Sequence, residues 1–340
     1  MPGVHGGHHG PVPMPPRRDD ADAPFLPGAA AGVLPPAGEH GEPLGEPVLQ
    51  TERVTFAYQD GTVALRDLSV AIRRGARLAI LGANGSGKST LFLTLNGILK
   101  PAQGRVLLGG APVRYDRAGL NDLRRRVGLV FQDPDTQLFA ASVRQDISFG
   151  PINLGLSDAE VRARVECAVA DTQIEDLTDR PTHLLSYGQK KRVAIAGVLA
   201  MDPEVIIADE PTAGLDPEAT ARLLELLNRL HAMGRTICIS THDLELALAW
   251  ADHTMVLRRG ELAASGPPQD VLRMPEVVRG ARLVQPIVLD TFARLVAAGV
   301  LAEDAPPPRT AAELVALIVA REPGSRNSGA PEVAAYNGSA

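Results

Sequence analysis

Cysteine, lysine and aromatic residues are scarce in this sequence of 340 residues. The two cysteines, Cys167 and Cys238, are too few for a scaffold built on disulfides and indicate a reducing compartment. No run of about 18 apolar residues occurs, so a membrane-spanning helix is not expected. The proline-rich N-terminal segment also has no apolar stretch typical of a secretion signal.

Positive charge is also limited. The 34 basic residues are fewer than the 40 acidic ones, and the net charge of −6 argues against a broad basic surface for nucleic acid. Hydrophobic residues make up 45% of the chain and charged residues 22%, which is typical of a folded globular protein. Arginine supplies most of the positive charge, because the only lysines are Lys88, Lys100, Lys190 and Lys191.

The two ends of the chain differ in composition from its middle. Residues 1–48 contain 11 prolines and 9 glycines, and residues 322–340 are rich in glycine, serine and proline. Such segments bury too little apolar surface to offset the entropy of ordering, so both are predicted to be disordered. His5, His8 and His9 in the N-terminal segment form either a weak buffer for Co²⁺ or Ni²⁺ or a low-complexity tract without that role.

The middle of the chain alternates between two periodic patterns. Short apolar, β-branched runs predict strands, and the stretches between them predict helices. This alternation predicts an α/β fold with a mostly parallel sheet covered on both faces. The predicted strands are Arg53–Tyr58, Arg77–Leu81, Val127–Phe131, Val205–Asp209 and Thr236–Ser240, and the predicted helices are Lys88–Ile98, Asp158–Thr172, Gln189–Met201, Pro217–Ala232 and Leu244–Ala251.

Two smaller features are predicted beside this pattern. Strands at Val106–Leu108 and Val113–Tyr115 are expected to pair across a Gly-Gly turn as a small antiparallel addition. Beyond about Gly266 the apolar spacing becomes helical, above all in residues 287–300 and 310–320.

A glycine-rich loop carries the strongest chemical signal. It follows the predicted strand Arg77–Leu81 and has the spacing G-x-x-x-x-G-K-S of a P-loop, in which backbone N–H groups surround phosphate at a helix N-terminus. Lys88 is expected to neutralise the β- and γ-phosphates, and the Ser89 hydroxyl to bind Mg²⁺. The alternative, a plain strand–helix turn, is disfavoured by this context. The expected nucleotide-binding residues are Gly82, Ala83, Asn84, Gly85, Ser86, Gly87, Lys88, Ser89 and Thr90.

Two adjacent carboxylates end the apolar strand that begins at Val205. Carboxyl ends of parallel strands meet at one edge of the sheet, which places both acids beside the P-loop. Asp209 is expected to hold Mg²⁺, and Glu210 to polarise the attacking water as a general base. An acidic strand end without a catalytic role is the alternative, and the P-loop upstream disfavours it.

Two single residues lie at comparable positions. His242 follows the strand Thr236–Ser240, and Gln132 follows the strand Val127–Phe131. A neutral His242 imidazole is able to donate to the γ-phosphate, and the Gln132 amide oxygen is able to reach Mg²⁺ or water. Taken alone, either residue is more often an ordinary surface or core group.

A second helix start suited to an anion lies upstream of Asp209. Leu185-Ser-Tyr-Gly-Gln189 precedes a strong helix, with Ser186 at the N-cap position. In this order with the P-loop and the carboxylate pair, the segment resembles the signature L-S-G-G-Q of the ATP-binding cassette (ABC) ATPases. The resemblance extends over about residues 48–269.

The resemblance implies a P-loop NTPase core with an α-helical subdomain, and two cassettes paired head to tail. Ser186 and Gly188 would then close on ATP held by the partner's P-loop. Asp216 would lie in the loop that communicates across the dimer, and Tyr58 would stack on adenine. Tyr187 departs from the pattern, because glycine is usual there, but its phenol is expected to leave the Ser186 hydroxyl and the Gly188 amide free.

A narrower set of motifs resembles the energy-coupling factor (ECF) importers, most closely their cobalt and nickel branch. These motifs are residues 96–101, 131–139, 149–153 and 186–197. In that family two identical or two related ATPase chains drive an integral membrane T component bound to a solute-capturing S component. Leu138 and Phe139, expected to be exposed, would suit docking to the membrane subunit; packing against the chain's own helical subdomain is the alternative.

By this resemblance the chain is expected to be an ATP hydrolase, peripheral on the cytoplasmic side of the cell membrane, that energises import of cobalt or nickel. The expected catalytic residues are Lys88, Glu210 and His242, the expected cofactors are ATP and Mg²⁺, and no nucleic acid partner is expected. The expected parts are a disordered leader (1–48), the ABC ATPase domain (49–270), a helical extension (271–321) that would add to the dimer contact, and a disordered tail (322–340).

Two alternatives remain. The first is an ABC ATPase for another solute, because the ATPase itself does not touch the solute. The second, a non-transport ABC machine, is less favoured because only 98 positions separate Lys88 from Ser186 and leave no room for long coiled coils. The chain also has a single P-loop, whereas translation forms usually carry two cassettes.

Overall fold

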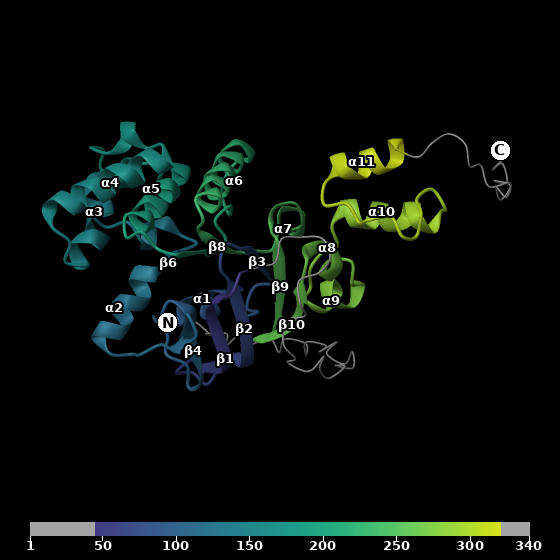
Figure 1. Cartoon of the computed structure of the whole chain (residues 1–340), viewed down its shortest axis with the longest axis horizontal. Coiled ribbons are helices and arrows are strands. Elements are labelled where there is room, and N and C mark those ends of the chain that lie inside the picture. The colour runs from purple at the N-terminus through teal and green to yellow at the C-terminus, as the bar shows by residue number, and fades with distance from the viewer. Residues whose placement is uncertain (1–44, 321–340) are drawn as a thin grey trace, which may run out of the picture. The chain divides into compact units, whose positions relative to one another are not determined.

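The computed structural model describes residues 45–320. Residues 1–44 and 321–340, which hold most of the predicted leader and tail and all of His5, His8 and His9, lie outside the described residues. Within the described part, two sheets and their helices form the fold (Figure 1).

The larger sheet of the described residues has six strands in the order β10-β9-β3-β8-β7-β6. All neighbours pair in parallel except β10 and β9, so the predicted mostly parallel sheet is confirmed. Its central strands are buried along nearly their whole length, which explains their continuous apolar sequence. The strands are β3 (Arg77–Leu81), β6 (Val127–Val130), β7 (Val205–Ala208), β8 (Thr236–Thr241), β9 (His253–Arg258) and β10 (Glu261–Gly266).

The antiparallel addition is larger than predicted. It has the strand order β2-β1-β4-β5, with β1 (Pro47–Ala57), β2 (Val63–Arg73), β4 (Gln103–Leu108) and β5 (Ala111–Pro112). The sequence pattern hides β2 because the β1–β2 pairing is irregular: Arg53 and Asp67 have positive φ angles of 49° and 45°. Such bulges interrupt the alternation of buried and exposed residues on which strand prediction depends.

The predicted strand Val113–Tyr115 is wrong, because β5 ends at Pro112. Gly109 and Gly110 both have positive φ, at 57° and 81°, and form a two-residue turn after which Ala111 pairs at once with Leu108. Beyond Pro112 the pairing continues only in one backbone hydrogen bond, from the Val113 N–H to the Val106 carbonyl at 2.9 Å.

Helices cover the larger sheet and form a separate group beside it. α3, α4 and α5 lie side by side in Figure 1 and share one core with the sheet. No helix between residues 45 and 320 is long and apolar enough to cross a membrane. The α-helices up to residue 250 are α1 (Lys88–Leu95), α2 (Arg117–Arg126), α3 (Val143–Asn153), α4 (Asp158–Thr172), α5 (Tyr187–Leu199), α6 (Pro217–Ala232) and α7 (Leu244–Trp250), and the 3₁₀ turns are η1 (Pro134–Thr136), η2 (Glu175–Leu177) and η3 (Thr182–Leu184).

The chain after β10 is helical, as predicted. Val271, Leu272 and Leu289 belong to the main core, so the first part of this region packs on the ATPase fold. Phe292 and Leu314 centre a smaller cluster between the last two helices. The helices are α8 (Pro268–Val271), α9 (Pro275–Gly280), α10 (Ile287–Ala297) and α11 (Ala311–Val319).

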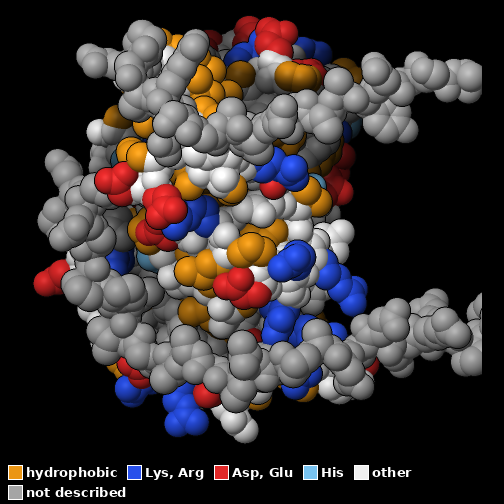
Figure 2. Space-filling model, turned by 90° about the vertical axis from the view of Figure 1, so that its right-hand side faces the viewer, with side chains coloured by type: hydrophobic (Ala, Val, Ile, Leu, Met, Phe, Trp, Pro, Cys, Tyr) orange, Lys and Arg blue, Asp and Glu red, His pale blue; other side chains and the backbone are white. Residues whose placement is uncertain are grey.

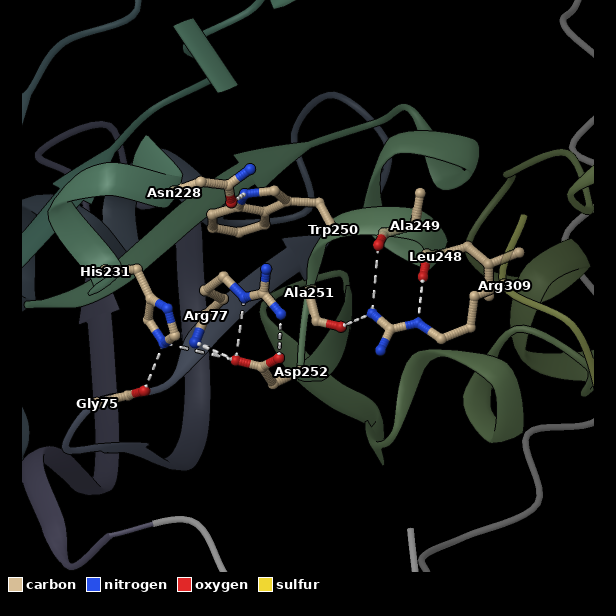
Figure 3. A network of polar contacts seen from close by, with 10 residues as sticks. All are labelled: Gly75, Arg77, Asn228, His231, Leu248, Ala249, Trp250, Ala251, Asp252 and Arg309. Atoms are coloured by element: carbon tan, nitrogen blue, oxygen red, sulfur yellow. Dashed lines mark hydrogen bonds and ion pairs between the residues drawn. The ribbon is translucent and has the colours of Figure 1, made fainter. Parts of the chain in front are cut away.

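Polar contacts hold α7 at both of its ends. At the carboxyl end, Arg309 Nε donates to the carbonyl of Leu248 at 2.9 Å, and the same guanidinium donates to the carbonyl of Ala251 (Figure 3). A cation there complements the negative end of the helix dipole. At the amino end, the Glu245 carboxylate accepts from the Ile287 N–H at 2.5 Å, at the start of α10.

A second group of contacts fixes the residue that follows α7. The Asp252 carboxylate pairs with Arg77 at 2.7 Å and lies 4.0 Å from His231, and the Trp250 indole donates to Asn228 (Figure 3). The start of β3 and the end of α6 are thereby joined to the turn between α7 and β9. α7 itself begins two positions after His242.

Candidate nucleotide site

The larger sheet brings the predicted site segments to one edge. β3, β8, β7 and β6 are parallel and adjacent in this order, so their carboxyl ends lie together. The segments that follow these ends are the P-loop, His242, the pair Asp209–Glu210 and Gln132. Residues separated by up to 160 positions therefore meet because of strand order alone.

The backbone of the P-loop depends on glycine. Gly82, Gly85 and Gly87 have φ angles of 154°, 78° and 107°, a region that other residues rarely adopt. A Cβ atom at Gly87 would also lie 2.8 Å from the carbonyl oxygen of Ala64. Among the described residues, Ser86 Oγ is buried and has no hydrogen-bond partner, which fits a loop shaped to receive the oxygens of a ligand.

Lys88 is the first residue of α1 and is only 6% exposed. Its Nζ donates to the carbonyls of Gly82 at 2.8 Å and Ala83 at 3.4 Å, inside the P-loop. It also lies 3.6 Å from Glu210 Oε1. Positive charge is thereby held at the N-terminus of α1, where the helix dipole adds to it.

Glu210 lies between two nitrogen groups. One carboxylate oxygen, Oε1, contacts Lys88, and the other, Oε2, is 3.1 Å from Nδ1 of His242. Lys88 and His242 thus both contact Glu210, although the three residues predicted to be catalytic follow three different strands. These two contacts orient the buried Glu210 carboxylate.

Ser240 is a residue that the sequence reasoning missed. Its Oγ accepts from the Glu210 N–H at 2.8 Å and donates to Asp209 Oδ1 at 2.5 Å. It therefore fixes both carboxylate-bearing residues from the neighbouring strand β8. The available signal was a serine in a strand that is buried along its whole length, since buried hydroxyls need a partner.

The oxygen groups suited to Mg²⁺ lie at the same edge. Ser89 is exposed at the start of α1, and Gln132 is exposed at the start of the loop after β6. Asp209 is buried at the end of β7. Hydroxyl, amide and carboxylate oxygens form the donor set that Mg²⁺ prefers. These residues therefore fit the ion chemically.

Tyr58 lies near the P-loop through its hydroxyl, which is 2.9 Å from the hydroxyl of Thr90 on α1. Its ring is packed edge-to-face on Phe56 with 5.1 Å between centroids, and 42% of the residue is exposed. An aromatic face is thus available beside the phosphate loop, as adenine stacking requires.

The signature residues lie at the start of α5. Ser186 is the N-cap, as predicted, and forms a capping box in which its Oγ accepts from the Gln189 N–H and its own N–H donates to the Gln189 side chain. Within residues 45–320, no hydrogen bond or ion pair joins Ser186 or Gly188 to Lys88, Glu210 or His242. The two helix starts of one chain therefore do not form one site.

Tyr187 and Asp216 have partners of their own. The Tyr187 hydroxyl donates to the backbone carbonyl of Gln132 at 3.3 Å, so the departure from glycine links the signature to the loop after β6. Asp216 caps α6 by accepting from the Ala219 N–H at 2.7 Å.

The expectation that Leu138 is exposed is wrong. Leu138 is half-buried and packs against the main core. Phe139 is 64% exposed and stacks edge-to-face on Phe149, with 4.6 Å between ring centroids. The exposed apolar surface near this loop is therefore built on Phe139 and Phe149, which is 49% exposed.

Comparisons with known proteins agree with this geometry. Residues 65–213 match the family described as ABC transporter. A cobalt import ATP-binding protein of Rhodobacter capsulatus is 56% identical over 244 residues, 72% of this chain and 87% of that protein. An energy-coupling factor transporter ATP-binding protein of Methanospirillum hungatei is 44% identical over 280 residues, 82% of this chain and 70% of the relative.

Solved structures show the same likeness. A cbiO1 protein of Clostridium perfringens, described as part of the ABC transporter complex cbiONQ, has a TM-score of 0.63 and 47% identity, covering 74% of this chain and 99% of that one. The ATP-binding cassette MJ0796, described as a dimer in a post-hydrolysis state with ADP and phosphate, has a TM-score of 0.59 and 28% identity, covering 65% and 98%. The chain therefore belongs to the ABC transporter family, as an ATP-hydrolysing subunit of the energy-coupling factor type.

Proposed function

We propose that Glu210 is the general base of ATP hydrolysis and that Lys88 and His242 hold the γ-phosphate. The contact of Glu210 with both of these residues carries the proposal. During hydrolysis, negative charge builds on the oxygens of the transferring phosphoryl group. Lys88 and the P-loop amides stabilise that charge, His242 donates to it, and Glu210 accepts a proton from the attacking water.

Mg²⁺, held by Ser89, Gln132 and Asp209, supplies charge neutralisation and orientation of the β- and γ-phosphates when bound. The chain's own contribution is to present these oxygens at one edge. The hydrogen bond from Ser240 keeps Asp209 in its orientation for this role.

We propose that two subunits pair so that Ser186 and Gly188 of one contact ATP at the P-loop of the other. Two observations support this. The first is that, within the described residues, no hydrogen bond or ion pair joins Ser186 or Gly188 to Lys88, Glu210 or His242 of the same chain. The second is that the similar cassette MJ0796 is described as a dimer with ADP and phosphate. Closure on intact ATP and opening after hydrolysis would provide the transport stroke.

The helical extension is proposed to add to the dimer contact. Exposed apolar side chains support this, and the face on the right-hand side of Figure 1, which Figure 2 shows, has hydrophobic patches between charged groups. Deleting the extension would also remove Val271 and Leu289 from the main core, so single substitutions are the cleaner test. The large apolar side chains exposed in this region are Met274, Val284, Ile287, Val315, Ile318 and Val319.

Val319→Glu on α11 is expected to weaken ATP-dependent dimerisation by about tenfold, because a charge replaces an apolar contact. Val319 is 75% exposed, so the fold should tolerate the change. Sedimentation of the ATP-bound protein measures the effect. Met233→Glu, at an exposed position after α6, serves as the control; equal dimerisation of both variants and the wild type would exclude the extension from the interface.

We propose that the subunit is peripheral on the cytoplasmic face of the cell membrane and drives import of cobalt or nickel through T and S components. The 56% identity with a cobalt import ATP-binding protein supports the solute. The exposed pair Phe139–Phe149 offers an apolar surface for a helix of the membrane subunit. Import of another solute is the second candidate, because relatives named only as energy-coupling factor proteins are also similar.

Affinity purification from native membranes, with identification of the co-purifying integral proteins, tests this proposal. Two short integral proteins are expected. Uptake of ⁵⁷Co²⁺ or ⁶³Ni²⁺ by cells lacking the subunit should be restored by the wild type and not by Glu210→Gln. Restored uptake of a different solute would support the second candidate, and recovery of a soluble solute-binding protein would oppose the ECF architecture.

A further inference from the structure

We propose that Lys191, on the signature helix α5, is a positioning residue that holds the peptide backbone of Glu210 in its catalytic conformation. Lys191 was not among the residues to which the sequence pattern assigned a role. It lies five positions after Ser186, on the helix that carries the signature. This inference rests on the proposed role of Glu210 as the base.

Lys191 is a buried cation whose donors are directed to two backbone carbonyls. It is 2% exposed, and its Nζ donates to the carbonyl of Pro211 at 2.8 Å and to that of Glu210 at 3.1 Å. Hydrogen bonds from a charged donor are stronger than those between neutral groups. A lysine that only improved solubility would extend its ammonium group into water instead.

The backbone of Glu210 needs such support. Its φ angle is 42°, in the left-handed region that a residue with a side chain rarely adopts. The N–H of this residue donates to Ser240 Oγ at 2.8 Å, and its carbonyl accepts from Lys191. Side chains of β8 and α5 therefore hold both polar groups of the Glu210 backbone in place. The direction of the Glu210 carboxylate follows from this backbone conformation.

The aromatic ring of Tyr187 also contacts the Lys191 ammonium group. The centre of its ring is 5.4 Å from Lys191 Nζ, within the range of a cation–π contact. Its hydroxyl is meanwhile bonded to the carbonyl of Gln132. The departure from glycine in the signature thus places an aromatic ring over the cation that supports the base.

The charge state of Lys191 is consistent with this role. Burial lowers its pKa to about 8, although the carboxylates around it act in the opposite direction. At neutral pH most of the population is therefore protonated and able to donate to both carbonyls. Its ammonium group is buried and donates to the carbonyls of Glu210 and Pro211, so it acts on the site through the Glu210 backbone.

The test is a comparison of kcat and KM for ATP in purified full-length variants. Lys191→Met has similar length and no donor, and it is expected to lower kcat at least about tenfold, because small misplacements of catalytic groups have effects of this size. KM for ATP should stay within about threefold, since P-loop contacts are unchanged. Lys191→Arg retains charge and donors and is expected to recover most of the lost kcat.

Lys190→Met is the matched control. Lys190 is the preceding residue of α5, but its Nζ pairs with Asp135 at 2.6 Å and does not contact Glu210. Its kcat should remain within about twofold of the wild type, as is usual for changes away from buried networks. If Lys191→Met fails to fold, Lys191→Gln replaces it as the test variant, since glutamine keeps a donor on a shorter side chain. A fall in kcat with a nearly unchanged KM for ATP is again expected.

The outcomes separate this inference from the proposed function. Unchanged kcat in folded Lys191→Met, or equal losses in kcat and ATP affinity that arginine does not repair, would overturn the positioning role. Wild-type turnover by Glu210→Gln would instead overturn Glu210 as the base. If Glu210→Gln is inactive and folded Lys191→Met is fully active, only the inference about Lys191 fails.

Discussion

Glu210→Gln is expected to lower ATP turnover at least about 100-fold while ATP still binds, because the amide retains the shape of the side chain but cannot accept the proton. A 100-fold loss corresponds to about 2.7 kcal/mol of transition-state stabilisation. Lys88 and the P-loop remain intact in this variant, so the affinity for ATP should change little. Because intact ATP would be contacted from both subunits, the variant should also accumulate as a closed dimer.

Single-turnover hydrolysis and sedimentation in ATP measure these two effects. Glu218→Gln is a matched control, since Glu218 is an exposed carboxylate that pairs with Arg222 on α6. Its turnover and association should match those of the wild type. Rapid hydrolysis by Glu210→Gln would show that another group, or no group, accepts the proton.

Lys88→Ala is expected to weaken ATP binding by about 100-fold or more, because it removes the buried cation of the P-loop. The change also deprives Glu210 of its 3.6 Å partner and the carbonyl of Gly82 of its donor at 2.8 Å. Removing one partner of a buried pair is strongly destabilising, so thermal unfolding must be measured beside binding.

Titration with ATP by calorimetry gives the affinity directly. Lys100→Ala is the control, because Lys100 is exposed and its ammonium lies 5.5 Å from the Tyr115 ring, away from the P-loop. This variant should bind as the wild type does. Retained affinity in folded Lys88→Ala would mean that the loop amides alone hold the phosphates.

Local sequence pattern was sufficient to predict the bounds of segments whose apolar residues recur with a single period. The strand Arg77–Leu81 and the helices Asp158–Thr172 and Pro217–Ala232 have the predicted bounds, because their apolar spacing and caps agree. The N-cap at Ser186 follows from the same local rule. Irregular segments were predicted less well: β2 was missed where bulges break the alternation, and β5 was shifted by a tight turn.

The proposed catalytic cluster of Lys88, Glu210 and His242 was likewise predicted only in part. Motif spacing was enough to identify Lys88, Glu210 and His242 as candidates. No pattern in the chain indicates that Lys88 and His242 both contact the Glu210 carboxylate. Ser240 and Lys191 were missed because serine in a strand and lysine in a helix are each ordinary. Their importance lies in the atoms they meet, which belong to residues 19 to 31 positions away.

The sequence by itself determined the family, the phosphate-binding chemistry and the alternation of strands and helices, because glycine spacing, charge and apolar period act over a few neighbouring residues. Tertiary structure alone decided which strand ends adjoin, that Leu138 turns inward, and that the signature helix supports Glu210 of its own chain. These features depend on strand order and on close packing between distant segments, and such long-range contacts leave no periodic trace in the chain.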